Sequence, residues 1–184
     1  MSDMDARTAA MRTMSEDVLK RRAASLAVEE TEAGDETRES LLLFSLGEEW
    51  YGVRTGQVRE LYNEYLLTPV PCVPPYIAGV INIRGEIVSV TDLKSLMSMG
   101  ASEAQLQPGD DQAPVIVIAD GPVCTALIVD AIGDIVEIAE GSVESSLAVG
   151  DKVTPEYVSG AFYTGGRLIA LVNTAKVLTP VGGE

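Results

Sequence analysis

The stretch YIAGVINIRGEIVSVTDL (residues 76–93) consists of two apolar runs, rich in Val and Ile, on either side of Arg84-Gly85-Glu86. Branched apolar residues favour strands, and two such runs around a short segment with glycine are typical of a hairpin. We therefore expect two antiparallel strands with Arg84 in the tight turn between them. A charged side chain in that turn can simply point into water or pair with Glu86.

The same pattern occurs a second time. Residues 157–178 align with residues 76–97 at a constant offset of 81. Tyr76, Gly79, Gly85 and Asp92 fall on Tyr157, Gly160, Gly166 and Asn173. At an offset of 74, Phe44, Gly47 and Glu60 fall on Ile118, Gly121 and Asp134. From residue 41 onward, the chain is therefore predicted to use one β module twice.

Each module reads as about five short strands followed by a helical turn, and such strands close most naturally into a small barrel. Two barrels of roughly 70 residues would be marginal alone, so we expect them to pack together and share a core. The glycines at the repeated positions are interpreted as structural, allowing a positive φ or a close backbone approach. They are Gly79, Gly85, Gly160 and Gly166.

Residues 1–40 differ from the rest, because they mix acidic and basic residues and end in the polar run EETEAGDETRES (29–40). We expect an N-terminal extension that is disordered or partly helical, and residues 41–184 as the folded body. A helix at SEDVLKRRAASLAV (15–28) that binds a partner is the alternative.

Composition excludes several classes of function. The net charge of −15 disfavours nucleic acid and anionic lipid. The chain has no histidine, and Cys72 and Cys124 are too few for a structural zinc site, so we expect no metal and no cofactor. The acidic N-terminus does not resemble a secretory signal, and no stretch is apolar for long enough to span a membrane. These features favour the cytoplasm.

Three stretches together resemble the CheW-type adaptor family of bacterial chemotaxis arrays. They are LLLFSLGEEWYGVRTGQVRELY (41–62), PPYIAGVINIRGEIVSVTDL (74–93) and EYVSGAFYTGGRLIALVNTAKVL (156–178). The second contains the family's G-V-x-N-x-R-G signature. The resemblance implies a mostly β fold of two tandem, pseudo-symmetric, five-stranded SH3-like barrels that share a core, with short helices.

The resemblance also implies a non-catalytic adaptor that couples methyl-accepting chemoreceptors to a CheA-type histidine kinase. Its partners would be the cytoplasmic tip of the receptors and the regulatory domain of the kinase, at membrane-associated receptor arrays. One alternative is a CheW-like scaffold of a non-motility chemosensory pathway. Another is a carboxylate-based enzyme on a β scaffold, whose acids would come from Asp130, Asp134 and Glu137.

By resemblance, the receptor-binding residues are Val58, Glu60, Arg84, Ile87 and Val88. Two positions apart on a strand, Val58 and Glu60 are expected on one face. Ile87 and Val88 point to opposite faces, so one enters the core and the other lines the contact surface, unless both are core. Arg84 either braces the strand of Glu60 or contacts a receptor carboxylate directly.

Adaptor and kinase are expected to join barrel to barrel through apolar strand faces, as the family implies. The candidates lie in VCTALIVDAI (123–132) and are Leu127 and Val129. Two departures from the family pattern stand out. Leu61-Tyr62 follow Glu60 where Ile-Arg is frequent, and Glu86 follows Arg84-Gly85 where an apolar residue is usual.

Overall fold

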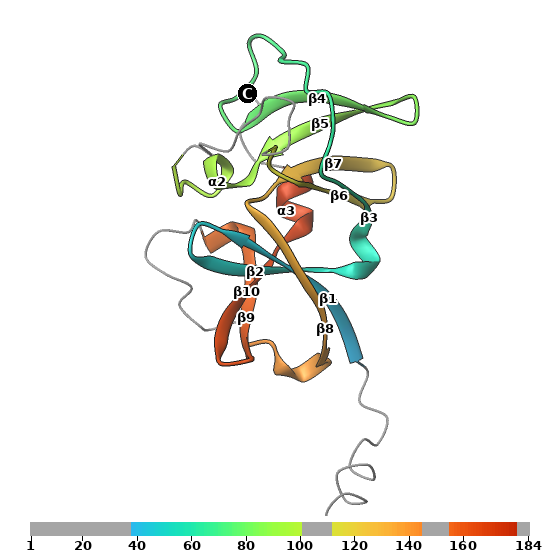
Figure 1. Cartoon of the computed structure of the whole chain (residues 1–184). Coiled ribbons are helices and arrows are strands. Elements are labelled where there is room, and N and C mark those ends of the chain that lie inside the picture. The colour runs from blue at the N-terminus through green and yellow to red at the C-terminus, as the bar shows by residue number, and fades with distance from the viewer. Residues whose placement is uncertain (1–37, 101–111, 145–154, 180–184) are drawn as a thin grey trace, which may run out of the picture. The chain divides into compact units, whose positions relative to one another are not determined.

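The structure is a computed structural model that describes residues 38–100, 112–144 and 155–179 (Figure 1). The extension expected over residues 1–40 lies, up to residue 37, outside the described residues. The first strand begins at Arg38, three residues before the expected start of the folded body. Arg38 also begins the larger of the two compact units of the chain.

The described residues form two five-stranded sheets with short helical segments. In spatial order, the first sheet contains β8 (Ala131–Ala139), β1 (Arg38–Leu46), β2 (Glu49–Arg54), β10 (Arg167–Val172) and β9 (Val158–Thr164). The second contains β3 (Val58–Tyr62), β6 (Val115–Asp120), β7 (Val123–Ile128), β5 (Glu86–Asp92) and β4 (Ile77–Ile83). The helical segments are η1 (Thr55–Gln57), α2 (Leu93–Leu96), η2 (Glu140–Ser142), η3 (Pro155–Tyr157) and α3 (Thr174–Leu178).

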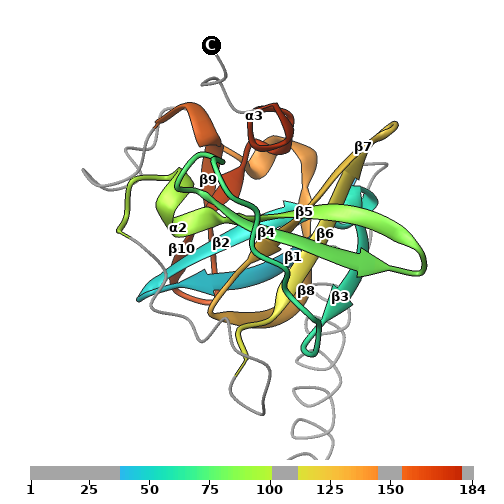
Figure 2. The same ribbon diagram turned by 90° about the horizontal axis from the view of Figure 1, so that it is seen from above.

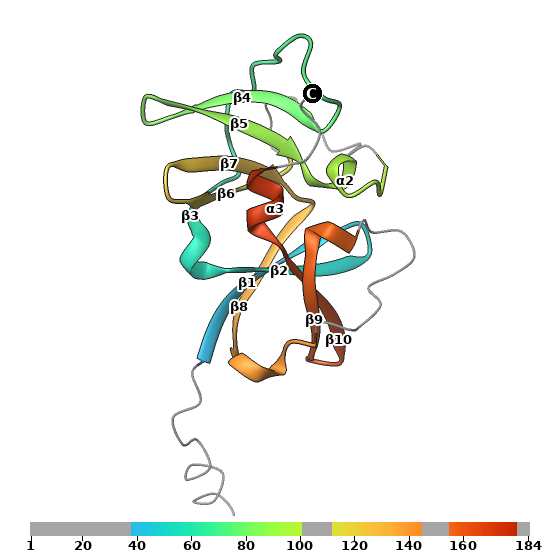
Figure 3. The ribbon, with the colours of Figure 1, turned by 180° about the vertical axis from the view of Figure 1, so that it is seen from behind.

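The sheets do not coincide with the sequence repeats. Each sheet combines the first hairpin of one repeat, β1–β2 or β6–β7, with the last three strands of the other repeat. The crossing is visible in Figures 1 and 3, where β8 descends from the second sheet to pair with β1. Each sheet is therefore complete only when both repeats are present.

Strand registers reproduce the repeat residue by residue. Parallel pairing aligns Ser89 with Thr125 in the second sheet and Ala170 with Tyr51 in the first. Ser89 and Ala170 are equivalent at the offset of 81, and Tyr51 and Thr125 are equivalent at the offset of 74. Both sheets have a β-bulge at the equivalent points of the β4–β5 and β9–β10 ladders. The mostly β fold with two pseudo-symmetric five-stranded units is thus confirmed.

Three apolar clusters hold the fold together. One lies inside each sheet, and the largest is shared, because it takes side chains from strands of both sheets and from α2 and α3. Phe44 and Tyr51 stack there with ring centroids 5.9 Å apart. Burying a large apolar side chain contributes about 1.5–3 kcal/mol. Packing in this shared cluster therefore stabilises the association of the two sheets.

Equivalent polar residues begin α2 and α3. The side chain of Asp92 accepts hydrogen bonds from the backbone N–H groups of Lys94 and Ser95, and Asn173 accepts one from that of Lys176. Such caps satisfy N–H groups that have no partner within the helix. The helical turn expected at the end of each module is thus present in both, and each helix directs apolar side chains into the shared cluster.

Two glycines allow the chain to pass close to a neighbouring segment. A Cβ at Gly79, whose φ is +153°, would lie 2.4 Å from the carbonyl oxygen of Thr68. At the equivalent Gly160, a Cβ would lie 2.6 Å from Cγ1 of Val143. Because Thr68 and Val80 exchange backbone hydrogen bonds of 2.9 Å, the Thr68 carbonyl cannot easily move away.

Replacing Gly79 by alanine is expected to destabilise the fold by at least about 2 kcal/mol, since strain adds to the close contact. Gly56→Ala is the control, because a Cβ there meets nothing within 4 Å, and its effect should stay below about 1 kcal/mol. Urea unfolding followed by the fluorescence of Trp50 measures both. Equal midpoints for the two variants would contradict this role of Gly79.

Candidate functional site

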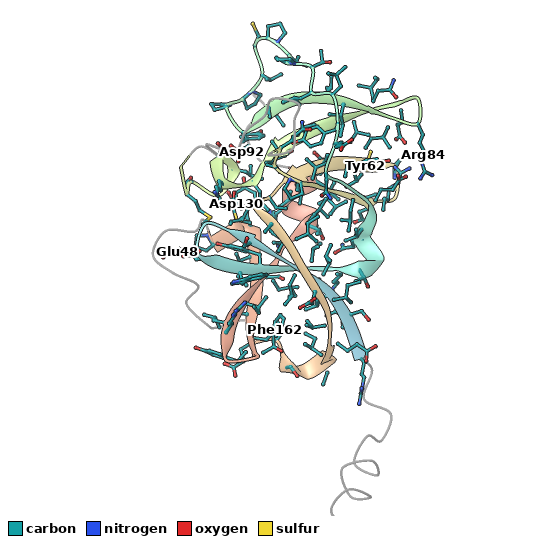
Figure 4. All side chains as sticks on the ribbon, in the orientation of Figure 1. Glu48, Tyr62, Arg84, Asp92, Asp130 and Phe162 are labelled. Carbon is teal, nitrogen blue, oxygen red and sulfur yellow. The ribbon has the colours of Figure 1, made fainter. Side chains whose placement is uncertain are left out.

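Glu60 and Arg84 meet at one end of the second sheet. Glu60 lies on the edge strand β3, and Arg84 lies in the turn between β4 and β5, where Figure 4 shows it at the tip of the hairpin beside Tyr62. Nη2 of Arg84 is 3.1 Å from Oε2 of Glu60. The side chain of Glu60 is 23% exposed and that of Arg84 is 78% exposed. Arg84 therefore contacts the strand of Glu60 while most of its surface faces solvent.

Arg84 occupies a backbone conformation that glycine adopts more easily. Its φ is +52°, in the left-handed region, and Gly85 follows with a φ of +90°. The side chain of Asn82 fixes this turn by accepting a 2.8 Å hydrogen bond from the backbone N–H of Gly85. A left-handed conformation costs a non-glycine residue about 1–2 kcal/mol, and the other sheet has Gly165 at the equivalent position. Arginine thus occupies this position despite a local backbone cost, and such strain is common at functional sites.

Tyr62 holds the carboxylate of Glu60 from the other side. The phenolic O–H of Tyr62 donates a hydrogen bond to Oε2 of Glu60, the same oxygen that faces Arg84. This hydrogen bond, followed by desolvation, raises the pKa of Tyr62 above its ordinary value, so the phenol stays protonated and remains a donor. Glu60 is therefore oriented by two groups before any partner arrives.

A second ion pair joins the same two segments. Nη2 of Arg59, on β3, is 3.3 Å from Oε2 of Glu86, the first residue of β5. Oε1 of Glu86 lies 3.6 Å from the thiol sulfur of Cys124. Burial and the neighbouring Glu86 raise the pKa of Cys124, which keeps the thiol protonated and poorly nucleophilic.

A bulge in β3 separates two residues that the sequence places on one face. In the pairing of β3 with β6, Val58 aligns with Ile118 and Glu60 with Val117, so Arg59 is an extra residue. Ile118 and Val117 are consecutive and therefore point to opposite faces. Val58 packs against the shared cluster, whereas Glu60 faces the other side. The expectation of one common face is wrong because the bulge breaks the alternation.

Ile87 and Val88 differ completely in exposure. Ile87 is 64% exposed, whereas Val88 is buried in the cluster inside the second sheet. Val88 therefore offers no surface to a partner, and its inclusion among the contact residues is corrected. Ser89 aligns with Thr125 in the pairing of β5 with β7, so the exposed residues two positions before them, Ile87 and Val123, point to the same face of the sheet near the turn.

Leu127 and Val129 cannot serve as a docking surface in this fold. Both are fully buried in the shared cluster. From Thr125 to Ile128, β7 is covered on both faces, since the alternate residues Ala126 and Ile128 pack inside the second sheet. The expectation that these two residues contact the kinase is therefore corrected: the apolar alternation of this strand reflects two cores.

The acidic residues considered for a carboxylate enzyme have separate roles. Asp130 accepts a hydrogen bond from the backbone N–H of Gly47 and forms a 2.6 Å ion pair with Lys94. Glu137 pairs with Arg38 at 3.6 Å, and Asp134 lines a small cavity in the first sheet. Asp130 and Glu137 thus bind different partners, which gives no support to a joint catalytic group.

The equivalent end of the first sheet has a different structure. Gly133 stands at the position of Arg59, and a Cβ there would lie 2.7 Å from the indole ring of Trp50. The guanidinium of Arg167 lies 5.1 Å from the centroid of that ring, within cation–π distance. A cavity of about 230 Å³ lies beside them and is lined by Asp134, Gly165 and Arg167 among others. No binding residue was expected at this end, although Trp50 and the glycines at the positions of Arg59 and Arg84 distinguish it within the repeat.

The described residues also bear on membrane insertion and metal binding. No described helix is long and apolar enough to cross a membrane. Within the same residues, no group of three or more Cys, Asp or Glu side chains is arranged to hold a metal ion.

Arg84→Gly is expected to leave the free energy of unfolding within about 1 kcal/mol of the parent protein. Relief of the left-handed backbone offsets the loss of an exposed ion pair and the greater freedom of glycine in the unfolded chain. Chemical denaturation measures the change. A substantially larger loss of stability would mean that Arg84 is needed for the fold itself.

The comparisons with known proteins agree with this architecture. Residues 40–181 match the CheW-like domain. The chain is 29% identical over 157 residues to the chemotaxis protein CheW of Klebsiella aerogenes, covering 85% of this chain and 91% of that protein. It is 28% identical over 140 residues to CheW of Treponema pallidum, covering 76% and 81%. The crystal structure of the scaffolding protein TtCheW from Thermoanaerobacter tengcongensis matches with a TM-score of 0.69 and 28% identity, over 83% of this chain and 94% of that one. The chain therefore belongs to the CheW-like domain family of chemotaxis scaffold proteins.

Proposed function

We propose that this protein is a non-catalytic adaptor that couples methyl-accepting chemoreceptors to a CheA-type histidine kinase. It would act in the cytoplasm and be recruited to membrane-associated receptor arrays. Family membership supports this role, since the similar proteins are named as chemotaxis proteins and one as a scaffolding protein.

The exposed ion pair of Glu60 and Arg84 is the observation that carries the proposal. A guanidinium has five N–H donors, so its contact with one carboxylate leaves donors for a second. The 78% exposure of Arg84 makes those donors accessible. Arg84 can therefore brace β3 and bind an acidic residue of the receptor tip at the same time.

An apolar surface beside the turn completes the proposed contact. Ile87 on β5 and Val123 on β7 are exposed on the same face of the sheet. The receptor tip is helical, and an amphipathic helix that covers these two side chains with its apolar face could place a carboxylate near Arg84. Apolar area would then supply affinity, and the charged turn would set the register.

Coupling requires that the kinase binds a different face. If the receptor occupies the end of the second sheet, a kinase bound elsewhere on the same rigid body is held near the receptor at a high effective concentration. A change at the receptor can then alter kinase activity through a coupling free energy of about 1–3 kcal/mol. Both partners have to be bound at once for this mechanism.

Substitutions at the ion pair are expected to weaken binding of a receptor cytoplasmic fragment while the fold survives. Arg84→Glu, Arg84→Gly and Glu60→Ala should each raise the dissociation constant at least about fivefold, as expected for central contact residues. Titration calorimetry measures affinity, and circular dichroism checks folding. Arg38→Ala is the control, because Arg38 forms an exposed ion pair in the first sheet. Unchanged affinity for all three site variants would refute this site.

A reconstituted system tests the coupling itself. Kinase, receptor fragment in membranes and this protein are combined, and phosphorylation of the kinase is measured with and without each component. Stimulation by receptor should require this protein and should fall with Arg84→Glu. A response only with the kinase of a non-motility pathway would move the assignment to that pathway, and ATP hydrolysis by the purified protein alone would contradict an adaptor.

A further inference from the structure

The ion pair Arg59–Glu86 lies beside the pair Glu60–Arg84, with the charges reversed: here β3 provides the arginine and the hairpin provides the glutamate. β3 contributes one positive and one negative residue, and the β4–β5 hairpin contributes the opposite charges two positions apart, at Arg84 and Glu86. The side chains of Arg59 and Glu86 are 46% and 51% exposed. Two ion pairs therefore connect the same two segments at the rim of the second sheet.

At this rim, β3 and the β4–β5 hairpin are connected through the side chains of the two ion pairs. β3 and β4 lie at opposite edges of the second sheet, where β3 pairs with β6 and β4 with β5. In Figures 1, 2 and 3, the β4–β5 turn and β3 lie on the same side of the sheet. The two ion pairs thus connect β3 to the β4–β5 hairpin, with which β3 forms no strand pairing.

The bulge in β3 makes the double pair possible. In a regular strand, consecutive side chains point to opposite faces, so only one of Arg59 and Glu60 could reach the hairpin. Because Arg59 is the extra residue of the bulge, both side chains reach it. The local backbone irregularity is therefore used to place two charges side by side.

The other half of the molecule shows that the fold does not need this arrangement. The residues at the positions of Arg59, Arg84 and Glu86 are Gly133, Gly165 and Arg167. The first sheet has the same strand order and equivalent registers without either ion pair. Its rim is instead filled by Trp50 against Gly133. The double pair is thus a specialisation of one end.

We propose that Arg59 and Glu86 are positioning residues that hold the β4–β5 turn against β3 and so keep Arg84 beside Glu60. This inference rests on the proposed function, because the group that is positioned is the proposed receptor contact. An exposed ion pair alone is weak, since ordering two long side chains costs entropy. A second pair between the same segments limits the motion of the turn, so the first pair forms at a lower entropic cost.

The experiment compares Arg59→Ala, Glu86→Ala and the charge exchange Arg59→Glu with Glu86→Arg. Amide hydrogen exchange of residues 82–86 in the free protein reports how firmly the turn is held, and titration with a receptor cytoplasmic fragment reports binding. Each single variant should speed exchange at the turn and lower affinity about two- to fivefold, and the charge exchange should restore both. Arg38→Ala and Glu137→Ala break an exposed pair elsewhere and should change neither.

The two readouts separate the inference from the function on which it rests. If the parent protein does not bind the fragment, the proposed function fails, and hydrogen exchange alone then decides whether Arg59 and Glu86 hold the turn. If Arg84→Glu lowers affinity but the Arg59 and Glu86 variants change neither exchange nor affinity, the positioning role is overturned. Loss of affinity with unchanged exchange and no restoration by the charge exchange would make Arg59 a direct contact and would also overturn it.

Discussion

The buried cluster between the sheets is the constraint on which the rest of the structure depends. It draws side chains from strands of both repeats and from α2 and α3, and its largest members are fully excluded from water. Because each sheet includes a hairpin from the other repeat, the cluster and the two sheets have to form together. The candidate site depends on this exchange: Glu60 lies on a strand of the first repeat that pairs with β6 of the second.

Periodicity and repetition predicted the strands and their duplication, but neither the exchange of hairpins between the two sheets nor the surfaces. The offsets of 81 and 74 located the equivalent strands, and the pattern predicted the helical turn that ends each module. Leu127 and Val129 show the limit of that reasoning. An apolar strand between two cores has the same pattern as a strand with one face prepared for a partner. Burial on both sides depends on what packs there, which local sequence does not encode.

The site itself was predictable only in part, for a comparable reason. Arg84 and Glu60 are recognisable by their motifs, and the hairpin pattern placed Arg84 in a turn. Arg59 itself gives no sign of the bulge, which reverses the side-chain alternation there, although the equivalent bulge of the first sheet lies at Gly133. The bulge in β3 separates Val58 from Glu60 and brings Arg59 to Glu86. One inserted residue thus decides which neighbours the charged groups have.

The exchanged hairpins also bear on how such a molecule could arise. In a single repeat, the last three strands would lack the hairpin that completes their sheet. A second copy of the same repeat would provide that hairpin and receive one in return, which gives a homodimer with exact twofold symmetry. Joining two copies in one gene would keep that homodimer architecture and free the halves from being identical. One end accordingly has Gly133 and Gly165 where the other has Arg59 and Arg84. Covalent fusion of a strand-swapped dimer thus allows a symmetric scaffold to present two unlike faces.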